Sequence, residues 1–279
     1  MKTRKEIGSF TAKGGFVNER TICEKFNNWK NDTEAKIWLN IMGYKIDQII
    51  KLSAIQVPLR IKKSDLEKWG VKETELYDFL HFKKADAQIK ILIKIGNLWK
   101  IENISLKKAN KSANFNQIDK RSVDSYKEMW GFDSEIAKWL KLFTGEIEPD
   151  NKKSLLKNNV LRDKKRVYLD EMPQRIQERI INFFKKNVIL VTSDVLKGRG
   201  GLSANWMLVT RYDEEKDVTS WILKDINTVM NHFGKGDVKL SPKGSLKIGK
   251  ITMQRKGGTP DPTKLQFKIK PCDLFELNK

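Results

Sequence analysis

Residues 85–108, ADAQIKILIKIGNLWKIENISLKK, decide the fold class, because apolar and polar residues alternate along them with a period of two. This alternation is typical of strands that bury one face. Gly96 and Asn97 interrupt the pattern with a dipeptide that favours a tight hairpin turn. We therefore predict two antiparallel strands, at residues 86–95 and 98–107.

Helical patterns surround this hairpin. The first third of the chain has apolar residues at mostly helical spacing, and helical spacing returns after the hairpin. The predicted helices lie at residues 14–29, 31–43, 117–130, 134–143 and 170–187. The last third alternates again and is interrupted by one helix, INTVMNHF. The sequence thus predicts an α/β fold with a mixed central sheet flanked by helices, and we expect residues 1–279 to form a single domain.

The charge of the chain is unusual. It has 55 Lys and Arg residues against 35 Asp and Glu residues, a formal net charge of +20. Either many lysines merely solvate the surface, or the protein binds a polyanion, of which nucleic acid is the commonest. The apolar runs are too short to cross a bilayer and the first residues lack a signal-peptide core, so we expect a cytoplasmic protein that does not bind membranes. Cys23 and Cys272 have no spacing typical of zinc sites.

Three polar residues are expected to meet at one end of the hairpin. Asp86 begins the first strand, while Ser105 and Lys107 end the second and share a strand face. Phosphodiester hydrolysis needs an activated water and neutralised charge, which Mg²⁺ held by carboxylates can supply with a lysine nearby. Glu19, on the first predicted helix, could add a second carboxylate. The alternatives are solvent-facing strand caps and a surface glutamate.

Asp86 followed by the string SLK at 105–107 resembles the PD-(D/E)xK nuclease core. Most of the chain resembles, more narrowly, the HinP-type type II restriction endonucleases, which are related to the Msp-type enzymes. The resemblance depends on several long strings in one order: TAKGGFVNER, FNNWKNDTEAKIWLNIMGY, FNQIDK, YKEMWGFD, LKGRGGLSANWMLV and LSPKGSLKIGKITMQRKGG.

This resemblance implies a Mg²⁺-dependent endonuclease that cuts duplex DNA at a short palindrome, GCGC in the relatives it is most similar to. It implies Asp86 as the principal metal ligand, Lys107 as the residue that orients water or stabilises charge, and Glu19 as a supporting carboxylate. Ser105 stands where Glu or Gln is usual, so metal contact there could run through water, and the carbonyl of Leu106 could contribute more.

Two neighbours of Ser105, Glu102 and Asn103, could compensate for the shorter side chain, and only Asn103 shares its strand parity. Relative to the family, residues 58–82 resemble a helical insertion. A restriction role also implies a monomer or weak homodimer and a companion DNA methyltransferase.

The string after Lys107 suggests a DNA contact. Phe115 could act as a wedge between base pairs, with Asn116, Gln117 and Lys120 bonding to base edges. The alternative is that Phe115 is the hydrophobic staple of a helix that begins near Asn116.

Residues 236–270 are rich in strand signals and carry a second candidate DNA-recognition region. Gln254, Arg255 and Lys256 precede two glycines, and Gln266 and Lys268 lie on the next predicted strand. Arg199, within KGRGG, could contact a phosphate. An ordinary basic hairpin tip is the alternative for each.

The leading interpretation is a type II restriction endonuclease. A repair or mobile-element nuclease with the same core is the second. The third is a DNA-binding protein on a catalytically decayed nuclease fold, in which Ser105 replaced the usual acid.

Overall fold

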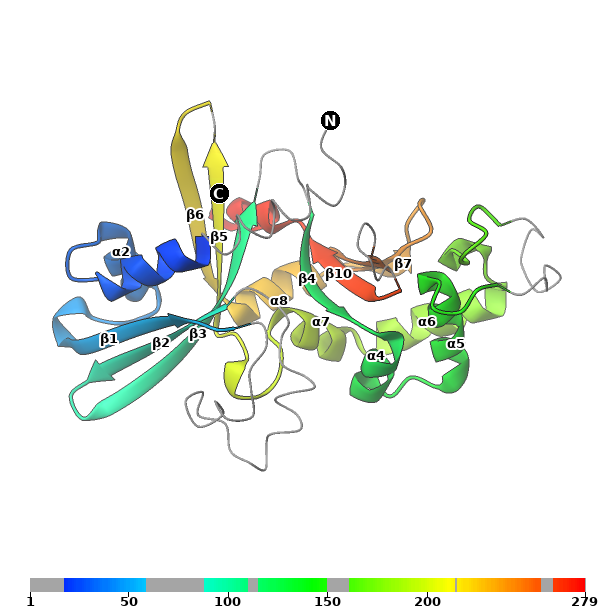
Figure 1. The fold of residues 1–279 in the computed structure, drawn as a ribbon, viewed down its shortest axis with the longest axis horizontal. Helices are drawn as coiled ribbons and strands as arrows, with labels where there is room; N and C mark the ends of the chain where they lie inside the picture. Colours follow the sequence, from blue (N-terminus) through cyan, green and yellow to red (C-terminus); the bar gives the residue numbers. More distant parts are fainter. Residues whose placement is uncertain are drawn as a thin grey trace. The chain divides into compact units, whose positions relative to one another are not determined.

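The computed structural model describes residues 18–58, 88–109, 115–149, 161–213, 215–256 and 263–278. The chain divides into two compact units, and each holds one five-stranded sheet (Figure 1). The first unit takes the described residues of Met1–Asn116, Leu196–Val229 and Lys270–Lys279, and the second takes those of Gln117–Val195 and Met230–Ile269. The interpretation of residues 1–279 as one endonuclease domain stays a prediction. The predicted insertion at 58–82 lies outside the described residues, apart from Pro58.

The sheet of the first unit has the strand order β1-β2-β3-β5-β6. Its strands are β1 (Ile49–Gln56), β2 (Gln88–Ile95), β3 (Leu98–Ala109), β5 (Trp206–Asp213) and β6 (Val218–Asp225). Only β3 and β5 pair in parallel, and the other neighbours are antiparallel. This arrangement confirms the predicted mixed α/β fold.

The predicted hairpin is confirmed. β2 and β3 pair from Ile95 opposite Leu98 to Gln88 opposite Ser105. Gly96 has φ +54°, a left-handed value that a tight hairpin turn requires and that glycine adopts without steric cost.

The prediction of helices throughout the first third is wrong for β1. Its sequence, IIKLSAIQ, contains two adjacent isoleucines at the start and no clean alternation, so the strand signal was weak. Pairing with β2 across most of its length overrides that weak local pattern.

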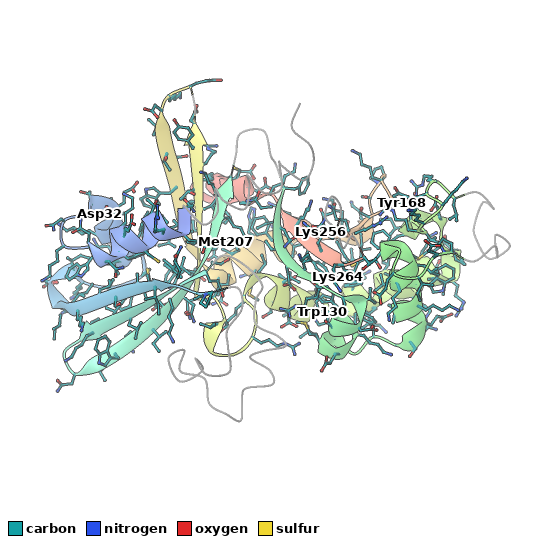
Figure 2. All side chains as sticks on the ribbon, viewed as in Figure 1. Asp32, Trp130, Tyr168, Met207, Lys256 and Lys264 are labelled. Atoms are coloured by element: carbon teal, nitrogen blue, oxygen red, sulfur yellow. The ribbon has the colours of Figure 1, made fainter. Side chains whose placement is uncertain are left out.

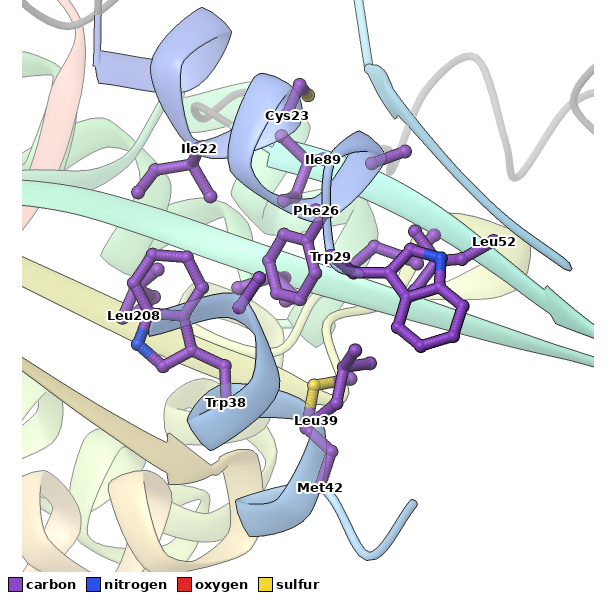
Figure 3. Close-up of a cluster of buried hydrophobic side chains, with 14 of the residues drawn as sticks. Ile22, Cys23, Phe26, Trp29, Trp38, Leu39, Met42, Leu52, Ile89 and Leu208 are labelled. Atoms are coloured by element: carbon purple, nitrogen blue, oxygen red, sulfur yellow. The ribbon is translucent and has the colours of Figure 1, made fainter. Parts of the chain in front are cut away.

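Two helices cover one face of this sheet. The first is described over residues 18–27, and α2 (Thr33–Ile41) follows it. Asp32 caps α2, because its Oδ1 accepts a hydrogen bond from the Ala35 N–H at 2.8 Å. Figure 3 shows Phe26 and Trp38 of the two helices in one apolar cluster, with ring centroids 5.3 Å apart. Ile104 and Leu106 of β3 belong to the same cluster, so they mark the helix-covered face.

The sheet of the second unit has the order β4-β10-β9-β8-β7. Its strands are β4 (Asn116–Arg121), β7 (Val238–Leu240), β8 (Leu246–Ile248), β9 (Ile251–Arg255) and β10 (Leu265–Ile269). The longer helices of the described chain outside the first third are α4 (Val123–Trp130), α5 (Ser134–Thr144), α6 (Gln174–Lys186), α7 (Val188–Leu196) and α8 (Ile226–Gly234). Short 3₁₀ turns lie at η1 (Ile46–Gln48), η6 (Leu169–Glu171), η7 (Gly200–Leu202) and η8 (Pro271–Asn278).

One face of the second sheet is apolar and packs on helices. Phe267 of β10 contacts the rings of Tyr126 and Trp130 of α4, at centroid distances of 5.2 and 5.5 Å. Ile176, Ile180 and Phe184 of α6 are buried as predicted, while Ile181 is half-buried.

The predicted helix from Gln117 to Trp130 begins later than expected. Residues Asn116–Arg121 form β4, and the helix starts after Ser122, whose Oγ accepts from the Ser125 N–H at 3.1 Å. Gln, Lys and Arg favour helices, but intrinsic propensity is a weak predictor, and pairing in the sheet overrides it here.

Candidate functional site

Ser105 and Lys107 lie on one face of β3, as their parity predicted, and both are buried. Ser105 is 0% exposed and Lys107 is 4% exposed. Neither is therefore a solvent-facing strand cap. Asp86 lies outside the described residues, but it precedes Gln88 by two positions, and Gln88 pairs with Ser105.

Polar residues of β2 and β3 share this face. Directly paired residues of antiparallel strands project to the same side, and Gln88 pairs with Ser105 while Lys90 pairs with Asn103. We call Gln88, Lys90, Asn103, Ser105 and Lys107 the polar face of the first sheet. All five are buried, although glutamine, asparagine and lysine are mostly surface residues. Burial lowers the pKa of Lys90 below its usual value. Such buried polar clusters are typical of functional sites.

The oxygen atoms of this face suit a hard divalent cation. Besides the Ser105 hydroxyl, the amide oxygens Gln88 Oε1 and Asn103 Oδ1 are buried and accept no hydrogen bond from the described residues. Leu106 points its side chain into the helix-covered core, so only its carbonyl could join them. Among the described residues there is no group of three His, Cys, Asp or Glu side chains that could hold a metal. Among the described residues, this face therefore offers a cation neutral oxygens only, and the metal-ligand role of Asp86 stays a prediction.

Glu19 lies on the helix at residues 18–27 and is 6% exposed, so it is not a surface glutamate. Residues three and four positions apart share a helix face, and Ile22 and Cys23 belong to the core cluster of Ile104 and Leu106. That cluster covers the sheet face opposite Ser105 and Lys107. The role of Glu19 stays a prediction, and the helix packing does not place it beside those residues.

Glu102 also lies away from the polar face. Its two carboxylate oxygens accept hydrogen bonds from the Tyr44 hydroxyl and from Trp206 Nε1, the latter at 2.9 Å. Parity places Glu102 with Ile104 and Leu106. Of the two residues that could compensate for Ser105, only Asn103 therefore lies on its face.

Phe115 is 40% exposed and directly precedes β4. The ammonium of Lys270 lies 5.3 Å from its ring centroid. Asn116 Nδ2 donates to the Lys108 carbonyl at 2.8 Å, which ties the start of β4 to the end of β3. The helix-staple alternative for Phe115 is wrong, because β4 and not a helix follows it.

Four of the predicted DNA-binding residues share one face of the second sheet. Gln254 of β9 pairs with Gln266 of β10, and Lys268 pairs with Thr252. Lys256 follows Gln254 by two positions, and its N–H donates to the Lys264 carbonyl at 2.8 Å (Figure 2). This face lies opposite the apolar face of Phe267. We call Gln254, Lys256, Gln266 and Lys268 the polar face of the second sheet.

Three lysines gather beside this face. Burial lowers the pKa of Lys256, and the neighbouring charges of Lys120 and Lys268 lower it further. Burial also lowers the pKa of Lys268. Mutual repulsion of ammonium groups is unfavourable in the isolated protein, and a bound polyanion relieves it. We call Lys120, Lys256 and Lys268 the lysine cluster.

Arg255 does not join its sequence neighbours. A strand points successive side chains to opposite sides, so Arg255 projects away from Gln254 and Lys256. Its Nη1 lies 3.6 Å from Asp163 Oδ2, and only 19% of its side chain is exposed. Arg255 therefore does not share the side of Gln254 and Lys256, and its DNA contact stays a prediction.

Arg199 is half-buried and directly precedes η7 in the first unit. Gln117 is half-buried in β4, and Lys120 is exposed on the same strand.

The sequence interpretation missed Gln88 and Lys90, and it considered Asn103 only as a substitute ligand. A signal was present, because Gln88 and Lys90 alternate with buried isoleucines in β2. Such alternation is equally typical of a solvent-exposed strand face, so burial could not be inferred from it.

Comparison with known proteins identifies the family and supports the fold. The family model described as "R.HinP1I restriction endonuclease" matches residues 69–275. The chain is similar to the solved structure "Crystal Structure of restriction endonuclease MspI in complex with its cognate DNA", with a TM-score of 0.55 and 13% sequence identity. The match covers 91% of this chain and 88% of that one, and at this identity it supports the fold.

No curated protein matches the chain significantly. Among the described residues, no helix has the length and apolar character that a membrane span needs. The family match extends over well more than half of the sequence and includes the hairpin, both polar faces and Arg199. The chain belongs to the R.HinP1I restriction endonuclease family and is a site-specific deoxyribonuclease.

Proposed function

We propose that the protein is a type II restriction endonuclease that hydrolyses phosphodiester bonds of duplex DNA at a short palindrome, with Mg²⁺, in the cytoplasm. The resemblance to HinP-type enzymes suggests GCGC as that palindrome. The observation that carries the proposal is the buried pair Ser105 and Lys107 on one face of β3, in a chain of a restriction endonuclease family.

Asp86, Ser105 and the Leu106 carbonyl would hold the metal, with Ser105 bound directly or through water. Bound there, Mg²⁺ would supply an activated water and neutralise charge on the phosphate. Gln88, two positions after Asp86, pairs directly with Ser105, and this pairing supports the ligand set.

Lys107 would stabilise the negative charge that develops on the scissile phosphate. An ammonium group shielded from water interacts more strongly with such charge than an exposed one. Its position two residues beyond Ser105 on the same face supports this role, because both side chains can then interact with one phosphate.

The lysine cluster would neutralise backbone phosphates, and the paired amides Gln254 and Gln266 would bond to base edges. The half-exposed ring of Phe115 would enter the base stack as a wedge. The DNA complex of MspI, which shares the fold, supports duplex DNA as the ligand.

The enzyme would act as a monomer or weak homodimer, and a companion methyltransferase would protect the host's own sites. A monomer would nick the two strands in turn.

Digestion of a sequenced plasmid in Mg²⁺, with the fragment ends mapped, tests the proposal. We expect discrete fragments whose ends all lie at GCGC, none when the metal is chelated, and none when the GCGC sites are methylated beforehand. Discrete cuts at another palindrome would correct the recognition site alone. Smears without common ends, or retarded but uncut DNA, would contradict the restriction function.

A further inference from the structure

The part of the polar face formed by Gln88 and Asn103 is covered by a glycine-rich loop of the same unit, residues 198–205, which we call the glycine loop. It contains Arg199, the turn η7 and two exposed glycines, Gly200 and Gly201. Among the described residues, no atom lies within 4 Å of where a Cβ on either glycine would stand, so none of them covers the outer side of the loop there. The inner side carries backbone carbonyls toward β2 and β3.

Two side-chain amides of the sheet bind these carbonyls. Asn103 Nδ2 donates to Gly201 O and to Ser203 O, both at 3.1 Å. Gln88 Nε2 donates to Leu202 O at 3.0 Å. Three consecutive carbonyls of the loop are thus bonded by two residues that flank Ser105, one on each strand.

The orientation of both amides follows from these bonds. A carbonyl can only accept a hydrogen bond, so each amide must turn its NH₂ group toward the loop. The other side of each amide loses hydrogen bonds in this orientation. Gln88 Oε1 and Asn103 Oδ1 are buried and accept no hydrogen bond from the described residues. The loop contacts therefore turn both amide oxygens away from the loop, where a cation at the polar face could satisfy them.

The end of the loop is fastened to the same strand. The Asn103 N–H donates to Asn205 Oδ1 at 2.9 Å, and the Asn205 N–H donates to Asn103 O at 2.8 Å. Asn103 therefore makes four hydrogen bonds to the glycine loop. Gln88 and Asn103 are 0% and 5% exposed, so water does not compete for these bonds.

We propose that Gln88 and Asn103 are positioning residues that hold the glycine loop beside Ser105 and Lys107, so that Arg199 contacts the DNA backbone next to them. The inference rests on the proposed function and deepens it. The ligand chemistry is a phosphodiester, recognised by a guanidinium whose place is fixed through the backbone carbonyls that follow it. Fixing the loop beforehand removes the entropy that its ordering on DNA would cost.

The test uses the full chain with Asn103→Ala, and with Asn103→Asp, which keeps the size of the side chain but removes both donors. Asn27→Ala is the matched control. Asn27 is also an amide that bonds a backbone segment of the first unit, through Nδ2 to Ala54 O at 3.0 Å and from Ala54 N–H to Oδ1 at 2.8 Å. Asn27 lies at the end of the first helix and bonds β1, so it does not belong to the polar face.

Three quantities are measured: hydrogen exchange of residues 198–205 with and without a GCGC duplex, the salt dependence of duplex binding in Ca²⁺, and single-turnover cleavage in Mg²⁺. In the wild type we expect DNA to protect the loop from exchange. Both Asn103 variants should lose that protection, reduce the salt slope by about 0.9 for one lost phosphate contact, and cleave on the order of 10-fold to 100-fold more slowly. Asn27→Ala should lose only stability.

The outcomes separate this inference from the proposed function. If the Asn103 variants keep loop protection, salt slope and cleavage rate, the positioning role is refuted while the endonuclease stands. If the wild type binds DNA and protects the loop but never cuts, the endonuclease fails and loss of protection in the variants still upholds the positioning role. If the wild type does not bind duplex DNA, both are refuted.

Discussion

In the proposed mechanism, Lys107 is the residue on which hydrolysis most directly depends. Its ammonium group is buried on the polar face, whereas the next residue, Lys108, is exposed and on the opposite side of β3. Lysine is almost never fully buried unless it is paired. Of these two neighbours, only Lys107 lies on the polar face, so only Lys107 is expected to act in hydrolysis.

Lys107→Ala should abolish DNA cleavage while leaving duplex binding near the parental affinity, because the lysine acts on charge that develops in the reaction. Cleavage and binding are measured on the same GCGC duplex, in Mg²⁺ and in Ca²⁺ respectively. Lys108→Ala is the control and should cut at the parental rate. Parental cleavage by Lys107→Ala would remove the lysine from the mechanism.

Lys256 and Arg255 give a second contrast between neighbours. Lys256→Ala should weaken duplex binding and lower the salt slope by about 0.9, because one phosphate contact is lost. Arg255→Ala should leave the slope unchanged and lower the free energy of unfolding by about 1 kcal/mol, because Arg255 pairs with Asp163. Binding titrations at several salt concentrations and urea unfolding measure the two effects. A lowered slope in Arg255→Ala would mean that this side of β9 also meets DNA.

The sequence predicted residue parity well wherever the strand was recognised. Ser105 and Lys107 share a face as expected, and the same rule, applied to β9, separates Arg255 from Gln254. It could not predict that the face of Ser105 is buried, because the glycine loop that covers part of it comes from residues about a hundred positions later.

At the scale of elements, the junction of β3 and β4 presents Phe115. Asn116 ties the start of β4 to the Lys108 carbonyl, and the ring of Phe115 remains 40% exposed beside Lys270. An exposed aromatic ring next to a fixed strand end suits insertion between base pairs.

Phe115→Ala should weaken binding to the GCGC duplex more than binding to a duplex without that site, because a wedge contributes where the DNA is distorted. Competition binding with both duplexes measures the difference. Equal losses on the two DNAs would eliminate the wedge.

The caps of two helices give a prediction on stability and pH. Asp133 caps α5, since its Oδ1 accepts from the Ile136 N–H at 2.9 Å, and this bond, with the Arg179 guanidinium nearby, lowers the pKa of its carboxyl below 3.8. A lowered pKa in the folded state contributes stability above the unfolded value, and this contribution is lost as the pH falls through the folded value.

Asp133→Ala should therefore cost about 1 kcal/mol near pH 7, and the cost should shrink as the pH falls below 3.8. Ser122→Ala removes the cap of α4, which carries no charge, so its cost should not follow this titration. Urea unfolding of both variants at several pH values checks the difference. An Asp133→Ala cost that is constant with pH would contradict the role of the carboxylate.

The elements themselves were predictable where a clear period extended over several turns or strand positions. The hairpin β2–β3, α5 and α6 were predicted from periodicity alone. β1 and β4 were not, because their formation depends on pairing with β2 and β10, which are distant in sequence. Local propensity is too weak to decide such segments.

At the scale of the whole molecule, the structure shows where some of the lysines behind the net charge of +20 lie. Part of it lies in the lysine cluster of the second unit, where the pKa values of Lys256 and Lys268 are lowered. Part lies in Lys90 and Lys107 of the first unit, which are buried. Lysines that merely solvated the surface would be neither buried nor crowded.

The central claim is that Asp86, Ser105 and Lys107 form one hydrolytic centre, whose loss stops cleavage without stopping DNA binding. Asp86→Ala tests it most directly, with cleavage and binding measured in the same preparation on a GCGC duplex. We predict no detectable cleavage in Mg²⁺ and unchanged affinity in Ca²⁺, since a ligand of the catalytic metal is lost while the lysine cluster is intact. Cleavage at the parental rate by Asp86→Ala would contradict the account.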